Sequence, residues 1–350
     1  MDVLHVGLVL RTASPVHHGY TAAVGDEKKI KLVRQVAVLV PNSSGQWTRR
    51  LVPVLGGNAL RGRMRRVAAY ETLKVLELAP EDFTNARRAF HTITSGGTMV
   101  KGGSHLWSDN PSYRQDRIAE WPLLSLMGFS FDDFMQRSKL RVHFGWPLLS
   151  AIRSAVELPM VDSHLFGDGD WIDLEEGGLS LAIEGSLTSR GLEQAHYEYR
   201  HADDDLVPMP EKNGTDKDED KKNDRAAMVV AYQYVPVGVP FGIRMLATDL
   251  NEVEQSLLRL MIEQSFPAED MIVFGSRATS GLGVFRVQRR SGVDHLPDPE
   301  VYRDYLRTHR EALRRQLLRD HDFLHDPDAR AGLKKRADSN KKDAVQKEES

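Results

Sequence analysis

The segment from Leu51 to Arg66, LVPVLGGNALRGRMRR, constrains the fold of this chain more than any other. An apolar run ends at Gly56 and Gly57, which permit a tight turn and the close approach of another backbone. Asn58 is a favoured N-cap, so we expect a helix from Ala59 to Leu78. Its first turns carry four arginines beside the positive end of the helix dipole, at Arg61, Arg63, Arg65 and Arg66. This pattern favours a phosphate-binding helix start, and a solvated basic helix is the alternative.

The chain has 350 residues, enough for one large domain or two modest ones. It contains no cysteine, which excludes disulfides and thiolate metal sites. The N-terminus lacks the basic region of a signal peptide, and no apolar run is long enough to span a bilayer. We therefore expect a cytoplasmic protein that has no membrane segment.

Charge is unevenly distributed along the sequence, although the formal net charge is only −3. Residues 1–101 contain 15 basic and 7 acidic residues, a net charge of +8. Residues 202–224 contain nine acidic residues and four lysines, a net charge of −5. The basic region suits a polyanionic partner. We expect the acidic stretch to be a mobile loop, residues 202–225, at the tip of a β-hairpin.

The order of the expected elements predicts an α+β fold. Strands are expected at 3–11, 36–40, 47–55, 140–145, 228–234, 241–247, 271–274 and 284–288, and helices at 59–78, 81–91, 250–265 and 299–319. This order is that of a ferredoxin-like, or RRM-like, β-α-β-β-α-β palm with an inserted helical segment and a β-hairpin thumb.

We divide the chain accordingly. Residues 1–78 form the first half of the palm, and 248–290 the second half. Residues 79–139 are an inserted helical and glycine-loop region, 140–247 contain strands and the thumb, 291–325 a C-terminal helix, and 326–350 a disordered basic tail. Two glycine-rich stretches, 92–104 and 275–283, can cradle phosphate or serve as plain connections.

Several short motifs follow one another in an order that is similar to a known family. Ser14–Gly19 (SPVHHG) resembles an S-P-L-H-I-G loop after a first strand. Val54–Gly62 resembles an I-P-G-S-S-L-K/R-G helix start, and Tyr234–Phe241 resembles a V-P-x-G-x-x-F strand. Leu123–Gly128 and Gly275–Gly283 are similar to that family's L-F-G segment and its C-terminal glycine loop. By these motifs the chain resembles the RAMP superfamily of CRISPR effector proteins, most closely the backbone subunit of type IV complexes.

The resemblance implies a non-catalytic subunit that binds guide RNA (crRNA), with several copies packed head to tail in a helical filament. The guide would then pair with target DNA or RNA, and other effector subunits and a helicase would join the complex. It implies contacts to the RNA backbone from His17, His18, Asn58, Arg61, Arg65 and Arg66, and further contacts from Ser95, Lys101 and Arg277. The thumb would run from about Tyr197 to Met228. We assign no catalytic residue, cofactor or metal ion.

Two other functions stay open at this point. A RAMP-family ribonuclease would cut target RNA with a metal-binding aspartate, as in type III complexes, or process guide precursors through His17 or His18. The position that aligns with that aspartate is near Lys31, which cannot bind a metal ion, although Asp26 is close by. An unrelated basic α+β protein could bind a nucleotide or a phosphorylated metabolite through its glycine loops.

Overall fold

The computed structural model describes residues 2–24, 28–42, 44–97, 111–131, 134–173, 186–189, 230–275 and 282–318. Its centre is an antiparallel sheet in the order β13-β14-β1-β12-β8, with β9 also paired to β12. The strands are β1 (Val3–Thr12), β8 (Leu140–Val142), β9 (Trp146–Pro147), β12 (Pro240–Thr248), β13 (Met271–Val273) and β14 (Val284–Ser291).

Two helices connect these strands in the order expected for a ferredoxin-like palm. The helix α1 (Gly57–Val75) lies in the chain between β1 and β8, and α10 (Glu252–Ser265) lies between β12 and the β13–β14 pair. The sequence order β1-α1-β8-β12-α10-β14 and the spatial order β14-β1-β12-β8 together define a ferredoxin-like sheet. The predicted α+β, ferredoxin-like class is confirmed.

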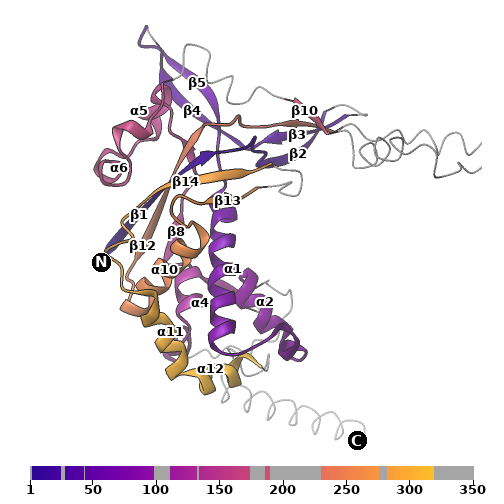
Figure 1. Ribbon diagram of the computed structural model, residues 1–350, viewed down its shortest axis with the longest axis vertical. Coiled ribbons are helices and arrows are strands. Elements are labelled where there is room, and N and C mark those ends of the chain that lie inside the picture. The colour runs from indigo at the N-terminus through magenta and orange to yellow at the C-terminus, as the bar shows by residue number, and fades with distance from the viewer. Residues whose placement is uncertain are drawn as a thin grey trace, which may run out of the picture.

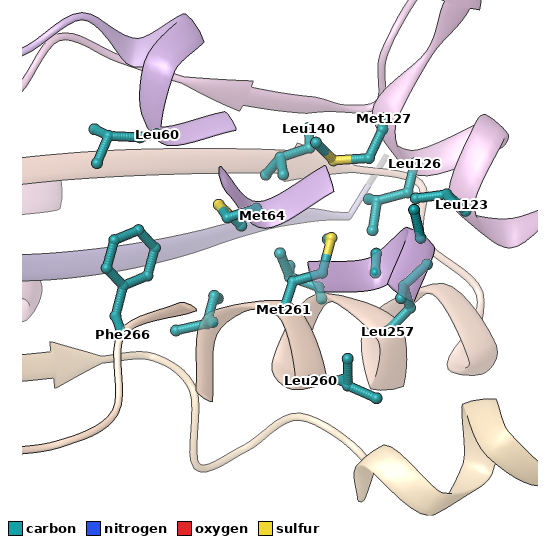
Figure 2. Close-up of a cluster of buried hydrophobic side chains, with 14 of the residues drawn as sticks. Leu60, Met64, Leu123, Leu126, Met127, Leu140, Leu257, Leu260, Met261 and Phe266 are labelled. Carbon is teal, nitrogen blue, oxygen red and sulfur yellow. The ribbon is translucent and has the colours of Figure 1, made fainter. Parts of the chain in front are cut away.

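Alternating side chains of β1 contribute to two cores, one on each face of the sheet. Val6, Leu8 and Leu10 point into the larger core, which is formed with α1, α10 and α4 (Pro122–Met127). Figure 2 shows this core, where Met64 of α1 lies near Met261 of α10. The helices α11 (Pro299–Thr308) and α12 (Arg310–Leu317) extend the same layer (Figure 1).

The opposite face of the sheet has its own smaller core. Val9 packs there with Val38 and Val52, which belong to the hairpin β4 (Gln35–Pro41) and β5 (Trp47–Pro53). The short helices α5 (Arg153–Val156) and α6 (Pro159–Leu165) cover the same side (Figure 1). A buried ion pair between Asp162 of α6 and Arg244 of β12 connects this helix to the sheet. The sheet is thus covered on both faces, but by layers of unequal size.

A second sheet has the order β10-β11-β3-β2. It comprises β2 (Gly19–Val24), β3 (Lys28–Val33), β10 (Ser186–Ser189) and β11 (Val230–Gln233). The strands β10 and β11 pair antiparallel, and the chain between them, 190–229, lies outside the described residues. The expected acidic loop 202–225 and the expected tail 326–350 also lie outside them.

Several boundaries differ from the expectation. The β2–β3 hairpin is not among the expected strands; its two strands pair over six residues each, and β11, about 200 residues away in the chain, adds a parallel pairing at Lys31. Thr92–Ser95 is not a loop but the last turn of α2 (Arg87–Ser95), which ends at Gly96 with a φ of 91°. The expected helix 299–319 is two helices, α11 and α12, separated at His309.

The inserted region between α1 and β8 contains short elements that surround the candidate site. They are the 3₁₀ turn Pro80–Phe83, α2, α3 (Pro111–Ala119), α4, β6 (Phe129–Phe131) and β7 (Phe134–Gln136). A further 3₁₀ turn at Ser150–Ile152 precedes α5, and another at Asp168–Asp170 follows α6. Across the ranges that the structure covers, no helix combines the length and hydrophobicity needed to cross a membrane.

Candidate nucleic-acid interface

The double glycine at the start of α1 is a close contact between two backbones. Gly56 is the N-cap, in extended conformation, and the helix begins at Gly57. A Cβ atom on Gly57 would lie 2.2 Å from the carbonyl oxygen of Val142 in β8, so no larger residue fits without movement. The predicted N-cap at Asn58 is therefore wrong: the helix begins two residues earlier than expected, at the glycine contact, and Asn58 is an exposed residue inside its first turn.

The His18 side chain stabilises this turn through a hydrogen bond. The Gly56 N–H donates to Nε2 of His18 at 2.8 Å, and the imidazole stacks on Phe274 with 5.4 Å between the ring centroids. Burial, together with Arg34 and His17, lowers the pKa of His18 to about 4. The ring is therefore neutral at pH 7, as an acceptor of this hydrogen bond must be. His17 has only 2% of its surface exposed, whereas His18 is half-buried with its Nε2 atom engaged by the Gly56 N–H.

Three of the four arginines of α1 hold neighbouring elements. Arg65 is buried and donates to the carbonyl oxygens of Met127, at 2.8 Å, and of Gly128. Arg61 also donates to Met127 O, so both guanidinium groups neutralise the negative end of α4. Arg63 donates to Ser265 O at 2.9 Å and to Val273 O at 3.1 Å.

Burial changes the pKa values of these groups without discharging them. Burial, and then the charge of Arg61, lowers the pKa of Arg65 to about 10. Burial also lowers the pKa of Arg61 and of Arg63. A guanidinium with a pKa near 10 is still protonated at neutral pH. The region therefore keeps concentrated positive charge close to α1.

This charge faces a cavity of about 520 Å³ between α1, α2 and the β6–β7 hairpin. Its walls carry four arginines and several uncharged polar groups, and the described residues that line it include no carboxylate: Asn58, Arg61, Gly62, Arg65, Arg66, Thr94, Ser95, Gly96, Gly128, Phe129, Ser130, Met135, Gln136, Arg137 and Ser138. Such a set of donors suits a phosphate-containing ligand.

Arg66 and Arg137 are the two cavity arginines whose guanidinium groups can bind a ligand. Both are exposed, and neither forms a side-chain hydrogen bond or ion pair with any part of the chain that the structure describes. The Nε atom of Arg61 is buried and also lacks a partner there. An anion in the cavity could therefore be held by Arg66 and Arg137 while Arg65 continues to support α4.

The cavity brings together five of the nine predicted contact residues, namely Asn58, Arg61, Arg65, Arg66 and Ser95. His18 lies at the glycine turn instead, and the backbone carbonyl of His17 lies beside Gly275. Lys101, Arg277 and both thumb residues, Tyr197 and Met228, lie outside the described residues, as does Asp26. Lys31 lies on β3 opposite Thr21, rather than in a loop.

Arg137 is the cavity arginine that is not expected from the sequence. It lies 71 positions after Arg66, just past the short strand β7, and nothing in its neighbourhood resembles a phosphate motif. Two short aromatic segments after Gly128, Phe129–Phe131 and Phe134–Gln136, could have indicated Arg137. They pair as the β6–β7 hairpin, and Arg137 directly follows that hairpin. No group of three or more histidine, aspartate or glutamate side chains that could bind a metal occurs in the parts of the chain that are placed.

Comparison with known proteins finds similar chains among the solved structures. No protein-family model and no curated protein matches the chain. A chain of a solved structure titled "Type IV-B CRISPR Complex" is similar, with 13% sequence identity and a TM-score of 0.50. The match covers 85% of this chain and 96% of that chain. The two chains share a fold. At this identity the match shows the architecture and leaves the residue roles to be argued from the site.

Proposed function

We propose that the chain is a guide-RNA-binding backbone subunit of a type IV CRISPR effector complex. The observation that carries this proposal is the extent of the fold match, which takes in 96% of a chain from a Type IV-B CRISPR complex. An isolated ferredoxin-like sheet is common to many functions. A match that covers 85% of a chain of 350 residues is far more restrictive. The motif order from Ser14 to Gly283 supports the same family independently of the coordinates.

The arginine cavity supports RNA as the ligand. Arg66 and Arg137 provide exposed charge, while Asn58 and Ser95 add neutral polar groups that hydrogen-bond to phosphate or sugar oxygens. Contacts of this kind hold an RNA backbone regardless of its sequence. Sequence recognition would then be left to base pairing between guide and target. Lys101, Arg277 and the thumb from Tyr197 to Met228 are further proposed RNA contacts.

The proposed assembly contains several copies along one guide. A head-to-tail interface that does not close into a ring produces a helical filament. Further effector subunits and a helicase would bind to that filament. We propose that the subunit itself is not a nuclease, because Lys31 occupies the position near which type III relatives carry their metal-binding aspartate.

The test measures RNA affinity against salt concentration for the double variant Arg66→Gln/Arg137→Gln. Each lost phosphate contact should reduce the salt slope of a single strand by about 0.7, so the double variant should lose about 1.4. The loss should be equal for RNAs of unrelated sequence. The matched control, Arg49→Gln/Arg50→Gln, removes two exposed arginines from β5 and should leave the slope unchanged.

Three results would contradict the proposal. They are an unchanged slope in the double variant, a loss that depends on RNA sequence, and a mononucleotide that binds as tightly as RNA. The last result would favour a nucleotide-binding or metabolite-binding protein.

A further inference from the structure

The edge strand β8 continues into a second group of basic and aromatic side chains outside the cavity. Arg141 and His143 are exposed, and Phe144 keeps 39% of its surface exposed. Phe144 contacts Trp146 edge to face, with 6.3 Å between the ring centroids. The structure, over the residues it describes, gives the Arg141 and His143 side chains no hydrogen bond or ion pair. We call Arg141, His143 and Phe144 the β8 surface.

The β8 surface adjoins the start of α1. A Cβ atom on Gly57 would approach the carbonyl oxygens of Val142 and His143 to 2.2 Å and 2.9 Å, which shows how closely the two backbones pack. Arg137, on the cavity wall, precedes His143 by six residues, a distance of at most about 20 Å along an extended chain. Asn58 lines the cavity and directly follows Gly57, so the start of α1 borders both the cavity and the β8 surface.

The charge around His143 is positive, and the ring itself is neutral. Burial lowers the pKa of His143, and the charges of Arg244, Arg141 and His5 lower it further. The charge of Arg244 is balanced by its buried partner Asp162, whereas Arg141 is exposed and unpaired among the described groups. At neutral pH the surface thus offers one free guanidinium beside two flat uncharged rings, a combination typical of single-stranded nucleic-acid sites.

Protection of a sheet edge is the other explanation for exposed charge on β8, because edge strands commonly carry charged residues that discourage aggregation. Phe144 argues against that explanation. An exposed aromatic ring at the end of an edge strand invites association, and it has no use in a purely protective role. In addition, Pro147 has no backbone N–H, so it already limits strand pairing at β9, which follows Phe144.

We propose that the β8 surface binds the single-stranded RNA segment adjacent to the one in the cavity, with a base stacked on Phe144 and a phosphate on Arg141. This inference rests on the proposed function, since it extends the same RNA path. His143 lies next to the stacked base and contributes its ring face. Recognition by stacking is independent of base identity, as a guide-binding subunit requires.

The experiment measures binding of a fluorescein-labelled single-stranded RNA by anisotropy, at several salt concentrations, for Phe144→Ala and for Arg141→Gln. Phe144→Ala should weaken binding about 5- to 100-fold without changing the salt slope, because it removes stacking but no charge. Arg141→Gln should reduce the salt slope by about 0.7. Tyr70→Ala and Arg49→Gln are the matched controls, since both remove exposed side chains elsewhere, and both should bind as the wild type does.

A second ligand separates stacking from loss of folding. On an RNA of the same length made of abasic ribose phosphates, Phe144→Ala should bind as the wild type does, whereas a misfolded variant would fail on both ligands. If Phe144→Ala and Arg141→Gln both bind RNA with wild-type affinity while Arg66→Gln/Arg137→Gln binds it weakly, the proposed RNA contact at the β8 surface is wrong. The proposed function would then still stand. Failure of the wild type to bind any RNA would overturn both.

Discussion

Arg65 and Arg66 are adjacent in the sequence, and the structure predicts opposite consequences for their substitution. Arg65 is buried against the end of α4, where it donates to the carbonyl oxygens of Met127 and Gly128. Arg66 is exposed on the cavity wall. We expect Arg65→Met to unfold more easily and to bind RNA normally once folded. We expect Arg66→Met to keep its stability and to bind RNA less tightly.

The magnitude follows from the hydrogen bonds that are lost. A hydrogen bond from a charged donor contributes about 1.5–3 kcal/mol, and a buried acceptor left without a partner costs a similar amount. Arg61 still donates to Met127 O, so Gly128 O suffers the larger loss. We therefore expect Arg65→Met to lose about 2–4 kcal/mol of unfolding free energy, and Arg66→Met less than about 0.5 kcal/mol.

Urea denaturation followed by far-UV circular dichroism measures this difference, and a thermal scan should show a melting temperature about 3–6 °C lower for Arg65→Met, given the unfolding entropy of a chain of 350 residues. Equal stability of the two variants would refute the structural role of Arg65. It would then place Arg65 with Arg66 among the groups available to a ligand.

Two further predictions concern the glycine turn. Gly57→Ala should destabilise the protein by about 1–3 kcal/mol in urea denaturation, because its Cβ would collide with Val142 O. Gly62→Ala on the same helix would place its Cβ in ordinary contact with the Arg66 side chain, at 3.6 Å, and should stabilise the protein by up to about 1 kcal/mol. The pKa of His18 is lower in the folded protein, about 4, than its ordinary 6.5, so stability is complete above pH 6.5 and falls as the pH drops toward 4. The loss between pH 8 and pH 5 should be about 2 kcal/mol, and His18→Gln should lose correspondingly less; an equal pH dependence in the variant would contradict the assignment.

Local sequence signals predicted the palm well. The turn after Pro41 predicts the β4–β5 hairpin, and Gly128 predicts the end of α4, where it adopts a φ of 62°. The apolar period of 250–265 predicts α10. These elements depend on residues close together in the chain, so a single sequence carries enough information to place them.

The parts that the sequence could not predict depend on distant contacts. The β2–β3 hairpin is completed by β11, and Glu71, which interrupts the apolar face of α1, pairs with Arg303 of α11 at 2.5 Å. The role of each arginine in α1 follows from which carbonyl groups lie opposite it, and α4 and β13 provide these groups. Four arginines in six residues indicated an anion site, but only the packing separates the supporting residue Arg65 from the exposed Arg66.

The most direct test of the central claim is to sequence the nucleic acid that accompanies the full chain when it is purified from cells that express a guide RNA and the other effector subunits. We expect guide RNA of uniform length bound to several copies of the chain, and much less RNA on the Arg66→Gln/Arg137→Gln variant. An RNA-free monomer, or bound RNA of random origin and length that the cavity variant retains equally well, would contradict it.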